Sequence, residues 1–164
     1  MEHSIIDNYL PLDQFASIKD LLMGVNLPWF YSETVTDNDN HNLQLDPYYF
    51  THKFHLNYTI NSTHYSTLVP LITKIAPKSI IRIKANLYPN MGKEIENDWH
   101  TDLPFQHKGA IFYINDNNGY TILEDGTKIE SKANRILFFD PSKQHKSTHC
   151  TNAKSRININ FNYF

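Results

Sequence analysis

Near its C-terminal end the sequence reads Arg156-Ile157-Asn158-Ile159-Asn160-Phe161-Asn162-Tyr163, a strict alternation of polar and apolar side chains. Successive side chains of a β-strand point to opposite faces of the sheet, so the alternation predicts a strand with one polar and one apolar face. Ile80 to Tyr88 alternates in the same way. Its polar face would carry Arg82, Lys84, Asn86 and Tyr88.

Shorter segments with strand composition lie between these two. They are Ala110 to Ile114, Tyr120 to Leu123, Thr127 to Ile129 and Arg135 to Phe139. Glu124-Asp125-Gly126 separates the second from the third and predicts a hairpin. A turn is also expected at Asn115-Asp116-Asn117-Asn118-Gly119, with Gly119 free to take positive φ. At least six short strands are therefore expected after residue 79.

The earlier part of the chain has helical periodicity instead. An apolar stripe predicts a helix from Gln14 to Gly24, with Asp13 as N-cap and Gly24 as the C-terminal stop. A second helix is expected over 63–75, where Pro70 marks either a kink or the first turn.

Helices followed by short strands favour a mainly β architecture, a sandwich or barrel with the N-terminal helices packed outside it. We expect residues 1–164 to form one domain, in which 1–78 are a helical and loop support region and 79–164 form the β core. The polar faces of the alternating strands either meet water or line a cavity. The alternation by itself favours the first interpretation, in which the polar faces are exposed to solvent.

The composition is that of an ordinary globular protein, with 40% hydrophobic and 20% charged residues. A formal net charge of −2 disfavours nucleic acid as a partner. The single cysteine, Cys150, excludes an internal disulfide. No basic start with an apolar run follows Met1, and no stretch is long enough to span a membrane, so we expect no signal peptide and a cytoplasmic location.

The first candidate metal-binding residues lie in Trp99-His100-Thr101-Asp102, a His-x-Asp motif. On a strand these two side chains would point to the same side and could converge on one ion. A second histidine, His145, follows the strand predicted from Arg135 to Phe139. Two imidazoles and one carboxylate are the ligand set of non-haem Fe(II) oxygenases, and the chain has no thiolate set for structural zinc.

A basic residue completes the pattern. Arg156 begins the last alternating strand, 11 residues after His145 and 7 after His149. A guanidinium group can bind a carboxylate with two hydrogen bonds, as an iron site with a dicarboxylate cosubstrate would require. A surface arginine on an edge strand is the alternative interpretation.

The ordered set resembles the Fe(II)/2-oxoglutarate-dependent dioxygenase superfamily, and its small phage and bacterial members related to prolyl hydroxylases in particular. The resemblance covers nearly the whole chain. The matching segments are Pro28-Trp29-Phe30-Tyr31, Arg82-Ile83-Lys84-Ala85-Asn86-Leu87-Tyr88-Pro89, Trp99-His100-Thr101-Asp102, Tyr113-Ile114-Asn115, Gly119-Tyr120-Thr121, Asn134-Arg135-Ile136-Leu137-Phe138 and Arg156-Ile157-Asn158-Ile159-Asn160-Phe161.

The resemblance implies a double-stranded β-helix, a form of jelly roll, with Fe(II) bound by His100, Asp102 and His145. Arg156 would bind the distal carboxylate of 2-oxoglutarate. The family spacing favours His145 over His149 as distal ligand, which would leave His149 at the surface; His52, His55 and His107 would be structural or solvent-exposed.

Two further residues, Tyr88 and Asn86, would hold cosubstrate or substrate according to the same resemblance. Related halogenases lack the carboxylate ligand, so Asp102 favours hydroxylation with O2 and conversion of 2-oxoglutarate to succinate. The expected substrate is a peptide or protein side chain, then a small molecule. Residues 36–42 are expected to be a loop, and the loops in 36–60 and 90–98 would select the substrate.

The alternative from another class is a non-catalytic, cupin-like jelly-roll binding protein, because a fold does not establish turnover. A binding protein would consume no 2-oxoglutarate. A virion or scaffold component is a third interpretation, which the modest size and the lack of repeats do not support. The sequence does not indicate the oligomeric state.

Overall fold

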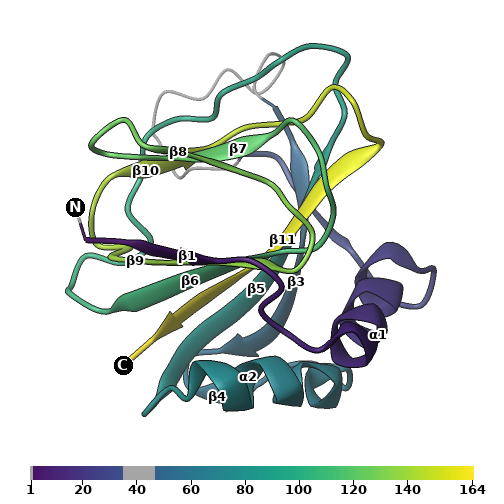
Figure 1. The fold of residues 1–164 in the computed structure, drawn as a ribbon, viewed down its shortest axis with the longest axis vertical. Helices are drawn as coiled ribbons and strands as arrows, with labels where there is room; N and C mark the ends of the chain where they lie inside the picture. The colour runs from purple at the N-terminus through teal and green to yellow at the C-terminus, as the bar shows by residue number, and fades with distance from the viewer. Residues whose placement is uncertain (1, 35–46) are drawn as a thin grey trace.

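The computed structural model describes residues 2–34 and 47–164. The chain forms two antiparallel sheets and a few helical segments (Figure 1). Their bounds are β1 (Ser4–Ile6), α1 (Leu12–Met23), β2 (Phe30–Ser32), β3 (Tyr49–Leu56), β4 (Thr59–Ile60), the 3-10 helix η1 (Tyr65–Leu68), α2 (Val69–Ile75), β5 (Ile80–Pro89), β6 (Lys108–Tyr113), β7 (Tyr120–Leu123), β8 (Lys128–Glu130), β9 (Arg135–Phe139), β10 (His145–Ser147) and β11 (Ser155–Tyr163).

The larger sheet has the strand order β1-β9-β6-β11-β5-β3-β2, with β4 paired to β3, and the smaller sheet has the order β10-β7-β8. Figure 1 shows the smaller sheet lying over one half of the larger sheet, while α1 and α2 lie on the opposite side. The predicted mainly β jelly roll with helices outside is therefore confirmed. The two alternating strands, β5 and β11, are neighbours in antiparallel register, with Arg156 opposite Tyr88.

Two apolar cores explain the hydrophobic pattern. The larger core lies between the helices and the larger sheet and includes Ile18, Leu71 and Ile83. The smaller core lies between the two sheets and includes Ile111 and Leu123. Strand β6 contributes to both cores, so it is apolar on both faces and does not alternate.

Both predicted helices are present, with differences at their ends. Pro11 rather than Asp13 occupies the N-cap of α1, and Asp13 lies in its first turn; Gly24 follows as C-cap, as predicted. The second helix begins as the 3-10 helix η1 and continues as α2, with Pro70 in the first turn of α2. Among the described residues, no helix combines the length and apolar character needed to cross a membrane.

The region 1–78 is more than helical and loop support, and that expectation is wrong for its secondary structure. Strands β1 to β4 all belong to the larger sheet, in which β3 lies between β5 and the edge strand β2. Most of the described part of the predicted loop region 36–60, residues 47–60, is therefore strand. The loop predicted at 36–42 lies outside the described residues.

The predicted hairpin is confirmed, because β7 and β8 pair antiparallel around Gly126. Gly126 adopts φ +84, and its N–H donates to the carbonyl of Leu123 at 2.9 Å. Positive φ is a conformation that glycine adopts without steric strain. The hairpin completes the smaller sheet above the polar face of β11.

Candidate metal centre

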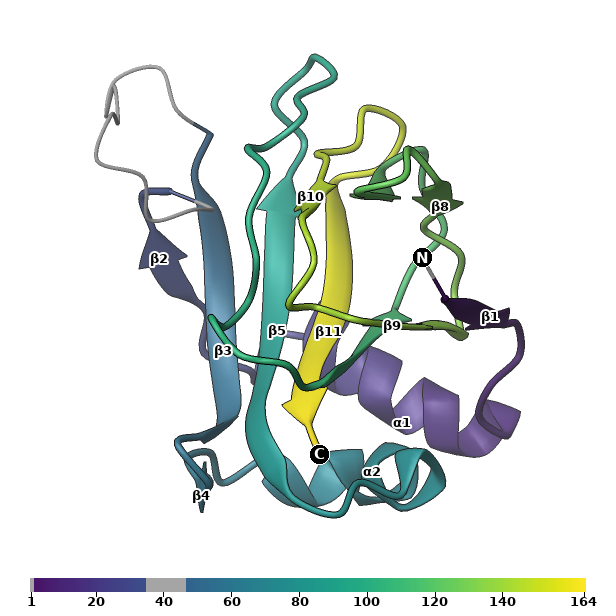
Figure 2. The same cartoon turned by 90° about the vertical axis from the view of Figure 1, so that its left-hand side faces the viewer.

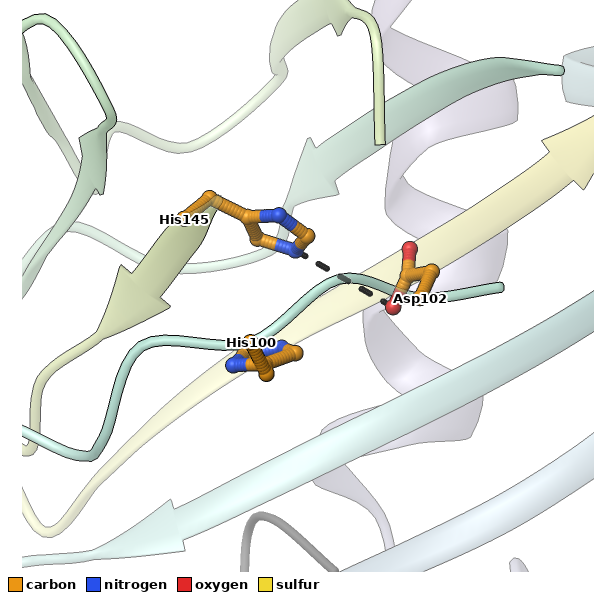
Figure 3. A group of neighbouring side chains, drawn as sticks. All are labelled: His100, Asp102 and His145. Atoms are coloured by element: carbon orange, nitrogen blue, oxygen red, sulfur yellow. Dashed lines mark ion pairs between the residues drawn. The ribbon is translucent and has the colours of Figure 1, made fainter. Parts of the chain in front are cut away.

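His100, Asp102 and His145 converge between the two sheets (Figure 3). Each offers one ligand atom, and these atoms lie within 4.8 Å of one another. The Nε2 atom of His145 is 4.0 Å from the Oδ1 atom of Asp102. His145 begins β10, whereas His100 forms only an isolated bridge with it, so the His-x-Asp motif does not lie on a regular strand and its two side chains converge from a non-strand segment.

Backbone hydrogen bonds fix the two imidazoles. The N–H of His100 donates to the carbonyl of His145 at 3.0 Å, and the N–H of His145 donates back at 2.9 Å. His100 Nδ1 lies 3.2 Å from the carbonyl of Asp98, and His145 Nδ1 lies 3.0 Å from the carbonyl of Lys143. Carbonyls only accept, so each Nδ1 carries the proton and each Nε2 is left with a lone pair for a metal.

Asp102 is held by polar side chains from two neighbouring strands. Arg82 of β5 donates from Nη2 to Oδ1 at 3.0 Å. Asn160 and Asn162 of β11 donate to Oδ2 at 3.1 and 2.8 Å. Asn162 in turn accepts from Arg82 Nε at 2.9 Å and donates to His107 Nε2 at 3.0 Å. The carboxylate is therefore positioned from several directions before any metal binds.

The electrostatic setting favours the forms that bind metals. Burial alone would raise the pKa of Asp102, but His145, Arg82 and the hydrogen bond from Asn162 together lower it well below its ordinary value. Burial, followed by the proximity of His145, lowers the pKa of His100 to about 4. At neutral pH Asp102 is therefore ionised and His100 is neutral, the states in which a carboxylate and an imidazole act as ligands.

A second polar pocket surrounds Arg156, which is completely buried. Its Nε donates to Ser131 Oγ at 2.7 Å, and its Nη2 donates to Thr121 Oγ1 at 3.0 Å. The guanidinium group also lies over the rings of Tyr88 and Tyr113, at 5.3 and 5.7 Å from their centroids. Among the described residues, no carboxylate pairs with Arg156 within 4.0 Å.

Gly119 makes room for this arginine. A Cβ atom there would lie 2.6 Å from Arg156 Cδ and 2.9 Å from Asn117 Oδ1. Gly119 does not use the positive φ that was open to it, because the glycines with positive φ among the described residues are Gly92 and Gly126. The glycine is required for space rather than for backbone conformation.

The other two predicted site residues lie on the same polar face. Tyr88 is buried below Arg156 and stacks on Tyr49, with ring centroids 5.4 Å apart. Asn86 donates from Nδ2 to Asn158 Oδ1 at 3.0 Å. The polar faces of β5 and β11 therefore line the space between the sheets rather than meeting water.

His149 was expected at the surface, and that expectation is wrong: its side chain is buried, with only 1% of its surface exposed. Its Nδ1 lies 2.8 Å from the carbonyl of Pro89, and its ring is 5.5 Å from that of Tyr88. The structure brings His145, not His149, to the other two ligand atoms. His52, His55 and His107 are also buried.

The sequence did not predict the residues that hold Asp102 and Arg156 in position. Arg82, Asn160 and Asn162 contact Asp102, and Thr121 and Ser131 contact Arg156. Alternation placed the first three on polar faces, but it could not show which polar residues meet the His-x-Asp motif. Thr121 and Ser131 carry no local pattern that distinguishes them from other hydroxyl side chains.

No family model matches the sequence, and no curated protein matches it. Solved structures do match its fold. A 2OG-Fe(II) oxygenase family oxidoreductase from Burkholderia pseudomallei has a TM-score of 0.72 at 12% identity, with 98% of this chain and 84% of that chain covered. The non-haem α-ketoglutarate-dependent epimerase SnoN of nogalamycin biosynthesis has a TM-score of 0.68 at 11% identity, covering 99% and 76% of the two chains.

A prolyl hydroxylase from Trichoplax adhaerens, solved with a peptide of the hypoxia-inducible factor oxygen degradation domain, is also similar. Its TM-score is 0.66 at 13% identity, with 99% of this chain and 83% of that chain covered. The chain therefore has the fold of the 2-oxoglutarate/Fe(II) oxygenases. At these identities the likeness concerns the fold alone, and the epimerase illustrates that the reaction varies among proteins that share it.

Proposed function

We propose that this protein is an Fe(II)- and 2-oxoglutarate-dependent oxygenase that hydroxylates its substrate. In this proposal His100, Asp102 and His145 bind Fe(II), and Arg156 binds the distal carboxylate of 2-oxoglutarate. Two imidazoles and one carboxylate suit Fe(II) and leave coordination positions open. The lone pairs of both Nε2 atoms and the ionised Asp102 fit this metal.

One observation carries the proposal: a fully buried arginine, which no carboxylate of the described residues pairs with, lies between the two sheets, as the triad does. Burying an uncompensated charge is unfavourable, so such a group is expected to meet an anion. Ser131 and Thr121 orient the guanidinium group without neutralising it. A dicarboxylate that reaches from the metal to Arg156 would satisfy both groups.

Bound Fe(II) and 2-oxoglutarate would supply the oxidative chemistry, with decarboxylation of 2-oxoglutarate to succinate at the expense of O2. The protein's own residues bind and orient. Arg82, Asn160 and Asn162 hold the Asp102 carboxylate in place, and the mutual backbone hydrogen bonds of His100 and His145 fix their imidazoles. Tyr88 and Asn86 would contact the cosubstrate or the substrate from the floor of the site.

The primary substrate in this proposal is a peptide or protein side chain or a small molecule. The peptide bound to the Trichoplax prolyl hydroxylase supports the first of these. Nucleic acid is disfavoured by the net charge of −2.

Succinate production tests the proposal. The protein would be purified anaerobically, given Fe(II), 2-oxoglutarate and O2, and assayed for succinate without any primary substrate. We expect slow succinate release from the wild type and none from Asp102→Ala or His145→Ala. Asp20→Ala, an exposed residue of α1, is the matched control and should retain the wild-type rate.

Absence of succinate, together with no metal-dependent binding of 2-oxoglutarate, would contradict the proposal. That result would favour the cupin-like binding protein. Succinate release that persisted in Asp102→Ala would instead show that the ligand assignment is wrong.

A further inference from the structure

We propose that Lys84, together with the hydroxyl of Tyr49, forms a carboxylate-binding subsite beside the triad, and that the primary substrate is a carboxylic acid. This inference rests on the proposed function and specifies the substrate class. The subsite is distinct from Arg156. The acid would be a free amino acid, another small acid, or a peptide that presents a carboxylate.

The position of Lys84 places it in the site. It lies on β5 between Arg82, which contacts Asp102, and Asn86, which contacts Asn158. The register pairs it with Asn160 on β11, another residue that donates to Asp102. Lys84 therefore belongs to the polar face that lines the inter-sheet space, and its side chain is partly buried there.

The contacts of Lys84 with the described residues include no paired carboxylate. Its Nζ donates to the hydroxyl of Tyr49 at a long 3.4 Å and lies 5.6 Å from the centroid of the Tyr49 ring. No carboxylate of residues 2–34 or 47–164 pairs with it within 4.0 Å. Burial and the neighbouring Arg82 lower the pKa of Lys84 by more than Tyr88 and Asp102 raise it, so its ammonium form is incompletely stabilised. A ligand carboxylate would restore that stabilisation.

The charges on this face point to an anionic ligand beyond the cosubstrate. Arg82, Lys84 and Arg156 are cationic, whereas Asp102 is the one carboxylate that they meet among the described residues. A divalent metal adds further positive charge, and dianionic 2-oxoglutarate only offsets that addition. The face then still carries an excess of cations, and Lys84 is the cation without an assigned anion.

The direction in which the Lys84 side chain points favours a contact with the substrate rather than with 2-oxoglutarate. Arg156 is bound by residues of the smaller sheet and the loop after β8, on the β11 side of β5. Lys84 leans the other way, toward Tyr49 of β3. Figure 2 shows β3 and β2 on the side of β5 that is remote from β8 and β10. A ligand group bound by Lys84 would therefore lie on the β3 side of β5, away from Ser131 and Thr121, which bind Arg156.

Pairs of acids and their carboxamides test the subsite. Acetate, N-acetylglycine and N-acetyl-L-leucine, each against its carboxamide, would be titrated into protein saturated with Zn(II) and 2-oxoglutarate, and Kd measured by ligand-observed NMR. We expect at least one acid to bind about tenfold more tightly than its amide in the wild type, because a hydrogen bond to a charged group is lost in the amide. The ratio should fall to about one in Lys84→Met.

Lys84→Arg keeps the charge and should restore the preference for the acid. Lys78→Met removes an exposed lysine from the segment between α2 and β5 and should leave the ratio unchanged. An unchanged ratio in Lys84→Met, or no preference for any acid in the wild type, would overturn the subsite. A raised Kd for 2-oxoglutarate in Lys84→Met with an unchanged ratio would assign Lys84 to the cosubstrate and overturn the substrate class. The same acids and carboxamides would also be titrated into the protein without metal and cosubstrate. A preference for the acid that depends on Lys84 in this form would support the subsite even if the oxygenase proposal failed, whereas loss of the preference only in this form would tie the subsite to the bound metal and cosubstrate.

Discussion

The two ends of the polar face of β11 handle buried charge differently. At one end Asn160 and Asn162 join Arg82 in compensating the carboxylate of Asp102. At the other end Arg156 is completely buried, and the side chains that bind it are neutral hydroxyl groups. Both charges lie against the polar face of β5 and β11, although Asp102 itself belongs to the segment between β5 and β6.

The difference distinguishes a preorganised metal ligand, Asp102, from an anion-binding residue, Arg156. Asp102 is compensated before any metal binds, so its carboxylate is already positioned as a ligand. No carboxylate of the described residues compensates the charge of Arg156, which favours binding of an anion over the bare protein. Changes at the Asp102 end should therefore act on the metal, and changes at the Arg156 end should act on 2-oxoglutarate.

Asp102→Ala should have the largest effect. It removes the only carboxylate of the triad, so we expect Mn(II) binding, measured by electron paramagnetic resonance as a proxy for Fe(II), to fall below detection. Asp20→Ala should bind Mn(II) as the wild type does. Retained Mn(II) affinity in Asp102→Ala would show that the comparison places the metal at the wrong end.

Arg156→Met should act on the cosubstrate alone. Loss of a bidentate charged hydrogen bond should raise the Kd of 2-oxoglutarate by about 100-fold, while Mn(II) affinity stays unchanged. Isothermal titration calorimetry on Zn(II)-loaded protein measures both quantities. Arg156→Lys should show an intermediate Kd, because it keeps the charge but not the bidentate geometry. Equal losses of metal and 2-oxoglutarate would remove the distinction between the two ends.

Acid should destabilise the metal-free protein through His100. Burial lowers its folded pKa to about 4 from 6.5, so between these values the unfolded chain binds a proton that the folded protein does not, and stability falls as pH falls. We expect the free energy of unfolding to drop by about 2 kcal/mol more in wild type than in His100→Asn between pH 7 and pH 5. Urea denaturation at the two pH values measures this difference. Asp102, whose folded pKa is lowered, should lose its contribution only below about pH 4.

Substitution of Arg82 should have a smaller effect on metal binding than substitution of Asp102. Arg82→Met removes the cation that positions Asp102, and we expect the Kd of Mn(II) to rise about tenfold, as for other residues that orient a metal ligand. Arg82→Lys should recover most of the affinity. Arg135→Met breaks an arginine–aspartate pair with Asp7, remote from the triad, and serves as control. An equal Mn(II) loss in the Arg82 and Arg135 variants would indicate a general effect on the fold.

Much of this arrangement follows from local sequence pattern. Alternation correctly placed β5 and β11, because each buries one face against the helices. The turn residues around Gly126 correctly predicted the β7–β8 hairpin. The motif residues His100, Asp102 and His145 lie together, although their roles as ligands stay a prediction.

Other features depend on contacts that no local pattern encodes. Strands β1 and β2 have three residues each, too few to show a period. Strand β3 has a register shift between Lys53 and His55, which interrupts its alternation, and it was expected to be a loop region. His149 follows the same polar stretch as His145, and only the fold shows that it is buried against Tyr88. The cytoplasmic location and the identity of the primary substrate stay predictions.

The most direct test is anaerobic titration of the Fe(II)-loaded protein with 2-oxoglutarate, followed by visible absorption. Chelation of Fe(II) by a 2-keto acid gives a charge-transfer band that neither component shows alone. The account predicts a band that saturates at one 2-oxoglutarate per chain, is lost in Asp102→Ala, and requires a much higher 2-oxoglutarate concentration in Arg156→Met. Absence of the band in the wild type, or a band indifferent to both substitutions, would contradict it.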